Sequence, residues 1–219
     1  MDLTPFSDPI LRHVFFELTT RYDCHTVILY GSRARGDFTS DSDYDLVGIR
    51  ADGAEARVGE IFDGHFLDAF VYPEAKLAEN EEKLLRIRGG KILVERGEFG
   101  KSLLTRIEAR YARGPEKLTP DELTAQVTWI RKTLSRARRG DIEGNFRRAW
   151  LLHELLAFAF ETSGRWYRGP KEGFRELADE DPEGHQLYAA ALAAPADHPA
   201  LEKLVAHFLK NYPEKTHVQ

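Results

Sequence analysis

The sequence predicts an α/β domain followed by an all-α domain. Over about the first hundred residues, short apolar runs typical of buried strands alternate with helical patterns. After Gly97 the strand patterns stop, and helical patterns continue toward Tyr212. The 219 residues are 42% apolar and 31% charged, which is enough apolar material for buried cores. We therefore expect two folded domains of different class in one chain.

The first half alternates helices and strands. A helix is expected over 8–22, where Pro9 suits the first turn. Apolar and β-branched runs predict strands at 26–30, 44–49, 66–72 and 91–95. We expect 53–62 to be a short, partly helical connection and 74–88 to be a helix. This alternation predicts a sheet covered by helices.

The second half contains helices alone. A helix over 98–112 ends near Gly114 and Pro115, which mark a linker. Thr119 can cap the next helix, and Glu122 can complete a capping box. That helix should run to about Arg139, and further helices should follow over 144–162 and from about 170 to 212. The predicted domains are 1–114 and 115–219.

Composition narrows the class of protein. Lys and Arg number 31 against 36 Asp and Glu, a net charge of −5, so a bulk electrostatic nucleic-acid binder is not expected. The single cysteine, Cys24, excludes an internal disulfide and a Cys-rich zinc site. No apolar run approaches the roughly 20 residues that span a bilayer. We therefore expect a cytoplasmic protein without a membrane partner.

The stretch YGSRARGDFTSDSDYDL, over 30–46, carries the chemistry. Gly31 and Ser32 follow a buried strand directly, so the backbone can approach a ligand, and the hydroxyl can bind a phosphate oxygen. Ten residues separate Ser32 from Asp43, and Asp45 comes two residues later. Residues two apart on a strand point to one face, so we expect the two carboxylates to converge.

A third carboxylate lies on a later strand. Asp68 is surrounded by apolar residues in FLDAFVY, where a buried carboxylate needs a metal or a cationic partner. Converging carboxylates repel one another unless a cation lies between them, and oxygen-only ligand sets select Mg²⁺ or Mn²⁺. A neighbouring strand that placed Asp68 beside Asp43 and Asp45 would complete a three-carboxylate site.

This arrangement resembles the nucleotidyltransferase superfamily that includes DNA polymerase beta. The motif covers 27–71, and the layout is similar to kanamycin nucleotidyltransferase-like antibiotic adenylyltransferases. It is also similar to minimal nucleotidyltransferases that work with helical HEPN partners. The resemblance implies a mixed sheet in a catalytic domain over 1–114 and a helical-bundle, HEPN-like substrate-binding domain over 115–219.

The resemblance also implies a reaction. A nucleoside monophosphate, AMP from ATP being the favoured case, would pass to a hydroxyl of a small-molecule acceptor, with release of pyrophosphate. An aminoglycoside-like antibiotic is one candidate acceptor.

The family pattern assigns roles to residues. Asp43, Asp45 and Asp68 would be catalytic and would hold two Mg²⁺ ions, with Mn²⁺ as a substitute. Gly31 and Ser32 would bind the β- and γ-phosphates. Two cations are further candidates for binding the nucleotide, Arg33 after the glycine turn and Lys171 at a helix start, although each also suits a solvated surface.

Other interpretations stay open. The acceptor could be a protein hydroxyl, as in regulatory or antitoxin-like relatives. Arg148 and His153 match the Arg-x(4)-His pattern of HEPN ribonucleases, although five residues is a poor same-face spacing on a helix. Trp129, Trp150 and Trp166 could line a pocket for a ring-bearing substrate or belong to the core. A homodimer is compatible with the sequence.

Overall fold

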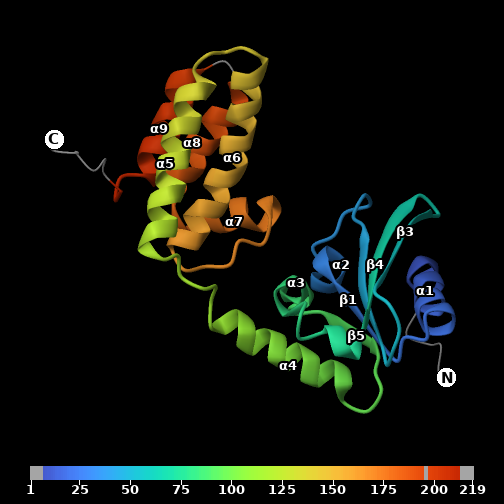
Figure 1. The fold of residues 1–219 in the computed structure, drawn as a ribbon. Coiled ribbons are helices and arrows are strands. Elements are labelled where there is room, and N and C mark those ends of the chain that lie inside the picture. The colour runs from blue at the N-terminus through green and yellow to red at the C-terminus, as the bar shows by residue number, and fades with distance from the viewer. Residues whose placement is uncertain (1–6, 195–196, 213–219) are drawn as a thin grey trace. The chain divides into compact units, whose positions relative to one another are not determined.

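The chain forms two compact units, Met1–Arg113 and Gly114–Gln219. The computed structural model describes residues 7–194 and 197–212. The start of the first predicted domain and the end of the second therefore lie outside the described residues. The predicted fold class is confirmed, because the first unit holds a mixed sheet with helices and the second is helical (Figure 1). Within the described ranges, no helix is both long enough and apolar enough to cross a bilayer.

The sheet of the first unit has the strand order β3-β4-β2-β1-β5. Its strands are β1 (Thr26–Tyr30), β2 (Tyr44–Arg50), β3 (Ala56–Phe62), β4 (His65–Pro73) and β5 (Lys91–Val94). β2 and β4 pair in parallel, and the other pairs are antiparallel. The mixed sheet that the resemblance implied is therefore present.

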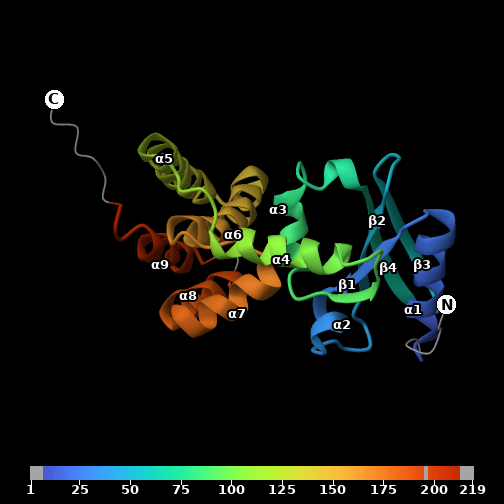
Figure 2. The same cartoon turned by 90° about the horizontal axis from the view of Figure 1, so that it is seen from below.

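The two faces of this sheet differ. Helix α1 (Pro9–Phe16) continues into a π-helical turn, Glu17–Arg21, and packs Val14 and Leu18 against one face. The other side is covered by α3 (Glu81–Leu84) and α4 (Phe99–Ala112), and Figures 1 and 2 show α1 and α3 on opposite sides. Leu67 and Ala69 belong to the α1 core, so by alternation Asp68 points to the opposite face.

Two expectations for the first unit are wrong. The range 53–62 was expected to be a partly helical connection, but it contains β3, which forms a hairpin with β4. The range 74–88 was expected to be one helix, but it breaks into the 3₁₀ turn Glu74–Lys76, α3 and the 3₁₀ turn Leu85–Ile87. In β3, pairing with a neighbouring strand outweighs the helix preference of its Ala, Glu and Arg residues.

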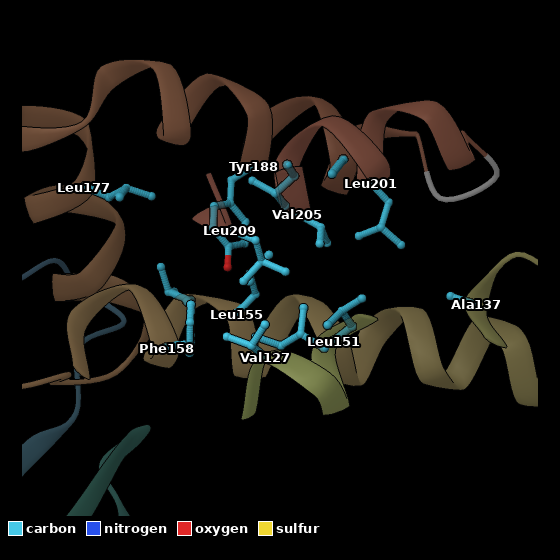
Figure 3. Close-up of a cluster of buried hydrophobic side chains, with 14 of the residues drawn as sticks. Val127, Ala137, Leu151, Leu155, Phe158, Leu177, Tyr188, Leu201, Val205 and Leu209 are labelled. Atoms are coloured by element: carbon cyan, nitrogen blue, oxygen red, sulfur yellow. The ribbon is translucent and has the colours of Figure 1, made fainter. Parts of the chain in front are cut away.

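The second unit is a helical bundle. Its helices are α5 (Pro120–Ala137), α6 (Ile142–Thr162), α7 (Pro170–Glu180), α8 (Pro182–Ala193) and α9 (His198–Phe208). The expected capping box is present, with Thr119 and Glu122 exchanging hydrogen bonds at the start of α5. Figure 3 shows the core that these helices enclose, with Leu151, Leu155 and Leu201 fully buried. Helix α6 begins two residues earlier than expected because Asp141 caps it.

Candidate active site

Strand pairing brings the predicted carboxylates together at one end of the sheet. Asp45 is the register partner of Tyr30 on β1 and of Asp68 on the parallel strand β4. Register partners on neighbouring strands point to the same face, so Asp45 and Asp68 are adjacent. Asp43 lies immediately before β2 and is exposed. Asp45 and Asp68 therefore lie on neighbouring strands, with Asp43 just before β2, near the end of β1 where Gly31 follows.

The glycine turn packs against this carboxylate group. Gly31 begins the short helix α2 (Gly31–Arg35) with φ of +72°, in the region that favours glycine. A Cβ atom at Gly31 would lie 2.3 Å from Oδ2 of Asp45, so any side chain there would displace the carboxylate. Ser32 follows and is buried, and its carbonyl accepts hydrogen bonds from the backbone of Gly36 and Asp37. The turn predicted to bind phosphates thus contacts the carboxylate predicted to bind metal.

Crowding changes the acidity of Asp45. Burial raises the pKa of its carboxyl above the usual value, and the neighbouring charges of Asp43 and Asp68 raise it further. The guanidinium groups of Arg86 and Arg35 oppose these effects without cancelling them. A carboxylate held among like charges is an energetically unfavourable arrangement, which a bound cation would relieve.

Asp68 has a cationic partner within the structure. Arg57 on β3 donates from Nε to Oδ1 at 2.7 Å and from Nη2 to Oδ2 at 2.9 Å, a bidentate ion pair. The Arg57 side chain also lies over the ring of Phe70, 4.9 Å from its centre. Sequence reasoning required a metal or a cation beside Asp68, and the structure supplies Arg57. The sequence analysis did not identify Arg57 as this partner, because it did not predict β3.

Arg33, a candidate for binding the nucleotide, contacts the loop before β2. Its guanidinium donates to the carbonyls of Ser42 and Asp43, at 2.8 Å from Nη2 and 3.2 Å from Nε respectively. It also stacks on the ring of Tyr44 at 3.6 Å. These contacts hold the loop that presents Asp43, which gives Arg33 a positioning role. The phosphate contact expected of Arg33 stays a prediction.

A second arginine of this face was missed by sequence reasoning. Arg86 lies in the 3₁₀ turn Leu85–Ile87, over the ring of Phe70 at 3.8 Å, and donates from Nη2 to the hydroxyl of Tyr72 at 2.9 Å. Its Nε is buried without a hydrogen-bond partner. Its charge lowers the pKa of Asp45.

The donor chemistry suits a hard divalent cation. All three candidate ligands are carboxylates, which Mg²⁺ and Mn²⁺ prefer, and glycine at position 31 keeps space beside Asp45. Across residues 7–194 and 197–212, however, no three His, Cys, Asp or Glu side chains form a ready metal cluster. Asp68 faces Arg57 instead. A shared metal would require Asp68 to turn from Arg57 or to divide its oxygens between the two.

The candidates in the helical unit have separate positions. Lys171 is exposed in the first turn of α7. Arg148 on α6 is buried and donates to three backbone carbonyls, those of Ala191, Ala194 and Asp197, while His153 on the same helix is exposed. The structure therefore does not place Arg148 and His153 together at a surface, as the ribonuclease interpretation requires.

Carboxylates crowded against a glycine turn at the end of a buried strand suit the binding of a divalent cation beside a phosphate group. Residues 17–110 match the family described as "Nucleotidyltransferase domain". This match lies within the first unit, which is therefore identified as a nucleotidyltransferase domain. It is thus a transferase of the class that moves nucleoside monophosphates.

The chain is similar to a solved structure, a nucleotidyltransferase-like protein from Exiguobacterium sibiricum, with 14% sequence identity and a TM-score of 0.43. That similarity covers 91% of this chain and 73% of the other. None of the curated proteins matches the chain.

Proposed function

We propose that the chain transfers AMP from ATP to a hydroxyl of a small-molecule acceptor and releases pyrophosphate. The observation that supports this most directly is the pairing of Asp45 with Asp68 beside Gly31, inside the matched domain. The acceptor hydroxyl oxygen bonds to the α-phosphorus, and the bond from that phosphorus to the β-phosphate oxygen breaks. Pyrophosphate leaves with the electron pair, and the hydroxyl proton passes to a base or to water.

The carboxylates and the glycine turn have different proposed roles. Asp43 and Asp45 would hold two Mg²⁺ ions, and Asp68 would share the one nearest the acceptor. When bound, these ions would lower the pKa of the hydroxyl and stabilise charge on the reacting phosphate. Gly31 gives the triphosphate access to the backbone, and Ser32 adds a hydroxyl contact.

Two cations complete the proposed binding site. Arg33 keeps Asp43 in place through the Ser42 and Asp43 carbonyls. Lys171 is proposed to contact the triphosphate, a role that its exposed place at the start of α7 permits.

A small-molecule acceptor is favoured over the alternatives. The chain carries its own helical unit, as the small-molecule enzymes it resembles do, which suits an acceptor bound within one protein. Ribonuclease activity through Arg148 is disfavoured, because a guanidinium bonded to three carbonyls inside the bundle has no access to RNA.

Calorimetric titration of the four nucleoside triphosphates, with and without Mg²⁺, tests the donor half of the proposal. We expect Mg²⁺-dependent binding of ATP that disappears in the double variant Asp43→Asn, Asp45→Asn. Asp41→Asn is the matched control, since Asp41 is an exposed carboxylate of the same loop. ATP binding that the double variant retains would refute the proposed site.

The acceptor half needs a separate assay. With ATP labelled on the α-phosphate, label should move onto small hydroxyl compounds and pyrophosphate should appear in equal amount. Label transferred to protein instead would favour the protein-modifying alternative.

A further inference from the structure

The helical unit contains a pocket of its own between α5 and α6. Its volume is about 360 Å³, within the range of small-molecule sites. The lining residues are Ala125, Gln126, Trp129, Ile130, Trp150, Glu154, Ala157, Phe158 and Glu161. We call it the α5–α6 pocket. All nine residues belong to one unit, so its chemistry can be described without reference to the sheet.

Two indole rings form its aromatic wall. Trp129 and Trp150 meet edge to face, with ring centres 5.2 Å apart and planes inclined by 67°. Trp150 remains 39% exposed, whereas Ile130 and Phe158 below are buried. The electron-rich face of an indole attracts cations more strongly than other aromatic faces do. The wall therefore suits a flat apolar group that carries positive charge.

Two carboxylates supply uncompensated negative charge. Glu154 accepts a hydrogen bond from Nε1 of Trp150 at 3.1 Å, and Glu161 accepts one from Nε2 of Gln126 at 3.2 Å. Within the described part of the chain, neither carboxylate has a salt bridge, and none of the nine lining residues is cationic. The donors that hold them are neutral, so the negative charge stays in the pocket.

The amide of Gln126 is half satisfied. Its NH₂ group is used by Glu161, but its carbonyl oxygen Oε1 is buried and has no hydrogen-bond partner. A buried acceptor without a hydrogen bond destabilises the folded state. A ligand with an N–H donor would supply the missing hydrogen bond, and an anion or a pure acceptor would not.

Arg147, which contacts Trp150, pairs with a carboxylate outside the pocket. The guanidinium of Arg147 lies 5.6 Å from the centre of the Trp150 ring. It pairs with Glu143, outside the pocket lining, at 3.5 Å. The contact shows that the face of Trp150 already accepts a cation on one side.

We propose that the α5–α6 pocket binds a small organic cation, namely a protonated amine on an apolar, ring-bearing body. The ammonium group lies between Glu154 and Glu161 and donates to Gln126, and the ring packs on Trp129 and Trp150. This goes beyond the proposed transfer reaction and does not rest on it, because every contact comes from the helical unit.

The rival occupant is a second copy of the chain. Ile142 and Phe146 are exposed on the same helix, about two turns and one turn before Trp150 respectively, and make an apolar stripe. The two carboxylates favour the cation over the copy, because burying unpaired charges in an apolar interface is costly.

Titration of the full chain with three matched probes tests the proposal. The probes are 2-phenylethylamine, a cation, its neutral analogue 2-phenylethanol, and the anion 3-phenylpropanoate, followed by calorimetry and tryptophan fluorescence without nucleotide or metal. We expect the amine to bind at least about tenfold more tightly than the alcohol, and the anion not to bind. Equal affinity for amine and alcohol, or no binding of the amine, would overturn the proposal.

Variants identify the groups responsible. Glu154→Gln and Glu161→Gln keep the shape and should each weaken amine binding about three- to tenfold, whereas the exposed Asp179→Asn changes total charge equally and should have no effect. An unchanged affinity in both glutamine variants, or an equal loss in Asp179→Asn, would contradict the assignment.

Sedimentation in parallel measures the state of the chain. A dimer that Phe146→Glu dissociates, together with absence of amine binding, would give this face to a second copy and overturn the proposal.

Discussion

The two units each bury a charged group, and they treat it in opposite ways. Arg148 in the helical unit is 4% exposed, yet its guanidinium donates to three carbonyls at 2.7–3.2 Å. Asp45 in the sheet unit is half-buried beside two further carboxylates, and its pKa is raised by burial and then by those charges. The chain stabilises the charge of Arg148 with hydrogen bonds, whereas the surroundings of Asp45 disfavour its charged form.

The difference separates a structural charge from a functional one. Arg148 contacts carbonyls at the end of α8, where a helix carries partial negative charge, so it joins α6 to the segment between α8 and α9. Both of its terminal nitrogens are engaged inside the helical unit. Asp45 keeps unfavourable neighbours that a divalent cation would make favourable. Unfavourable charge at a strand end is therefore the more informative sign of a site.

The largest expected effect is on catalysis at Asp45. Asp45→Asn should lower transfer by about 1,000-fold or more, because it removes a proposed metal ligand without changing shape. Its melting temperature should stay equal or rise, because a charge repelled by Asp43 and Asp68 is gone. Transfer assays and thermal unfolding of Asp45→Asn beside Asp41→Asn check both. An active Asp45→Asn protein would remove the basis of the proposed function.

The same variant makes a prediction about pH. The pKa of Asp45 in the folded protein lies above the ordinary 3.8, so the folded state binds this proton more tightly than the unfolded state does. The stability contributed by that proton is present in full below the unfolded pKa and is lost as pH rises through the folded pKa. The advantage of Asp45→Asn in melting temperature should therefore open with rising pH and close in acid. An advantage that grew toward low pH would contradict the shift.

The opposite case is Arg148, where stability and not chemistry should suffer. Arg148→Met removes three hydrogen bonds made by a buried side chain and should destabilise the helical unit by about 2–4 kcal/mol. All three tryptophans lie in that unit, so their fluorescence reports its unfolding in urea. Arg138→Met, which breaks an exposed pair with Glu202, is the control and should cost less than about 1 kcal/mol. Equal and small losses of unfolding free energy in both variants would show that the hydrogen bonds of Arg148 contribute no more than an exposed ion pair does.

Sequence patterns predicted those features that depend only on residues close together in the chain. The apolar run of β1, the Gly31 turn and the spacing to Asp43 and Asp45 are read along the chain, as is the Thr119 cap. The acceptors of Arg148 lie on a distant segment, and no spacing along α6 indicates them. Packing across segments therefore lay beyond the sequence.

The sequence before β4 also contains a signal that indicates the edge strand β3. Asp63 and Gly64 both have positive φ, +48° and +77°, and join β3 to β4 through a two-residue turn. Asp-Gly between alternating apolar residues is a strong hairpin signal. The hairpin register sets Arg57 opposite Phe70, diagonal to Asp68, from which the ion pair follows.

A smaller effect is expected at Asp68, whose charge is already compensated. Asp68→Asn should lower transfer about 100-fold while the ATP dissociation constant changes less than about twofold, since its proposed place is at the acceptor side. Calorimetry and transfer assays on one preparation separate the two effects. A large rise in the ATP dissociation constant would instead place Asp68 on the triphosphate.

The smallest expected effect concerns Arg57, whose cation competes with a metal for the same carboxylate. Arg57→Gln frees both oxygens of Asp68 and removes a nearby positive charge, so Mn²⁺ should bind about three- to tenfold more tightly. Electron paramagnetic resonance of free Mn²⁺ measures this without any turnover. Arg57→Lys keeps the charge and is the control, and it should change Mn²⁺ affinity less. Weaker Mn²⁺ binding in Arg57→Gln would mean that Arg57 orients Asp68 for the ion instead of competing with it. Asp68 would then have a cationic partner and still bind a metal, so compensation by the chain would no longer distinguish structural charges from functional ones.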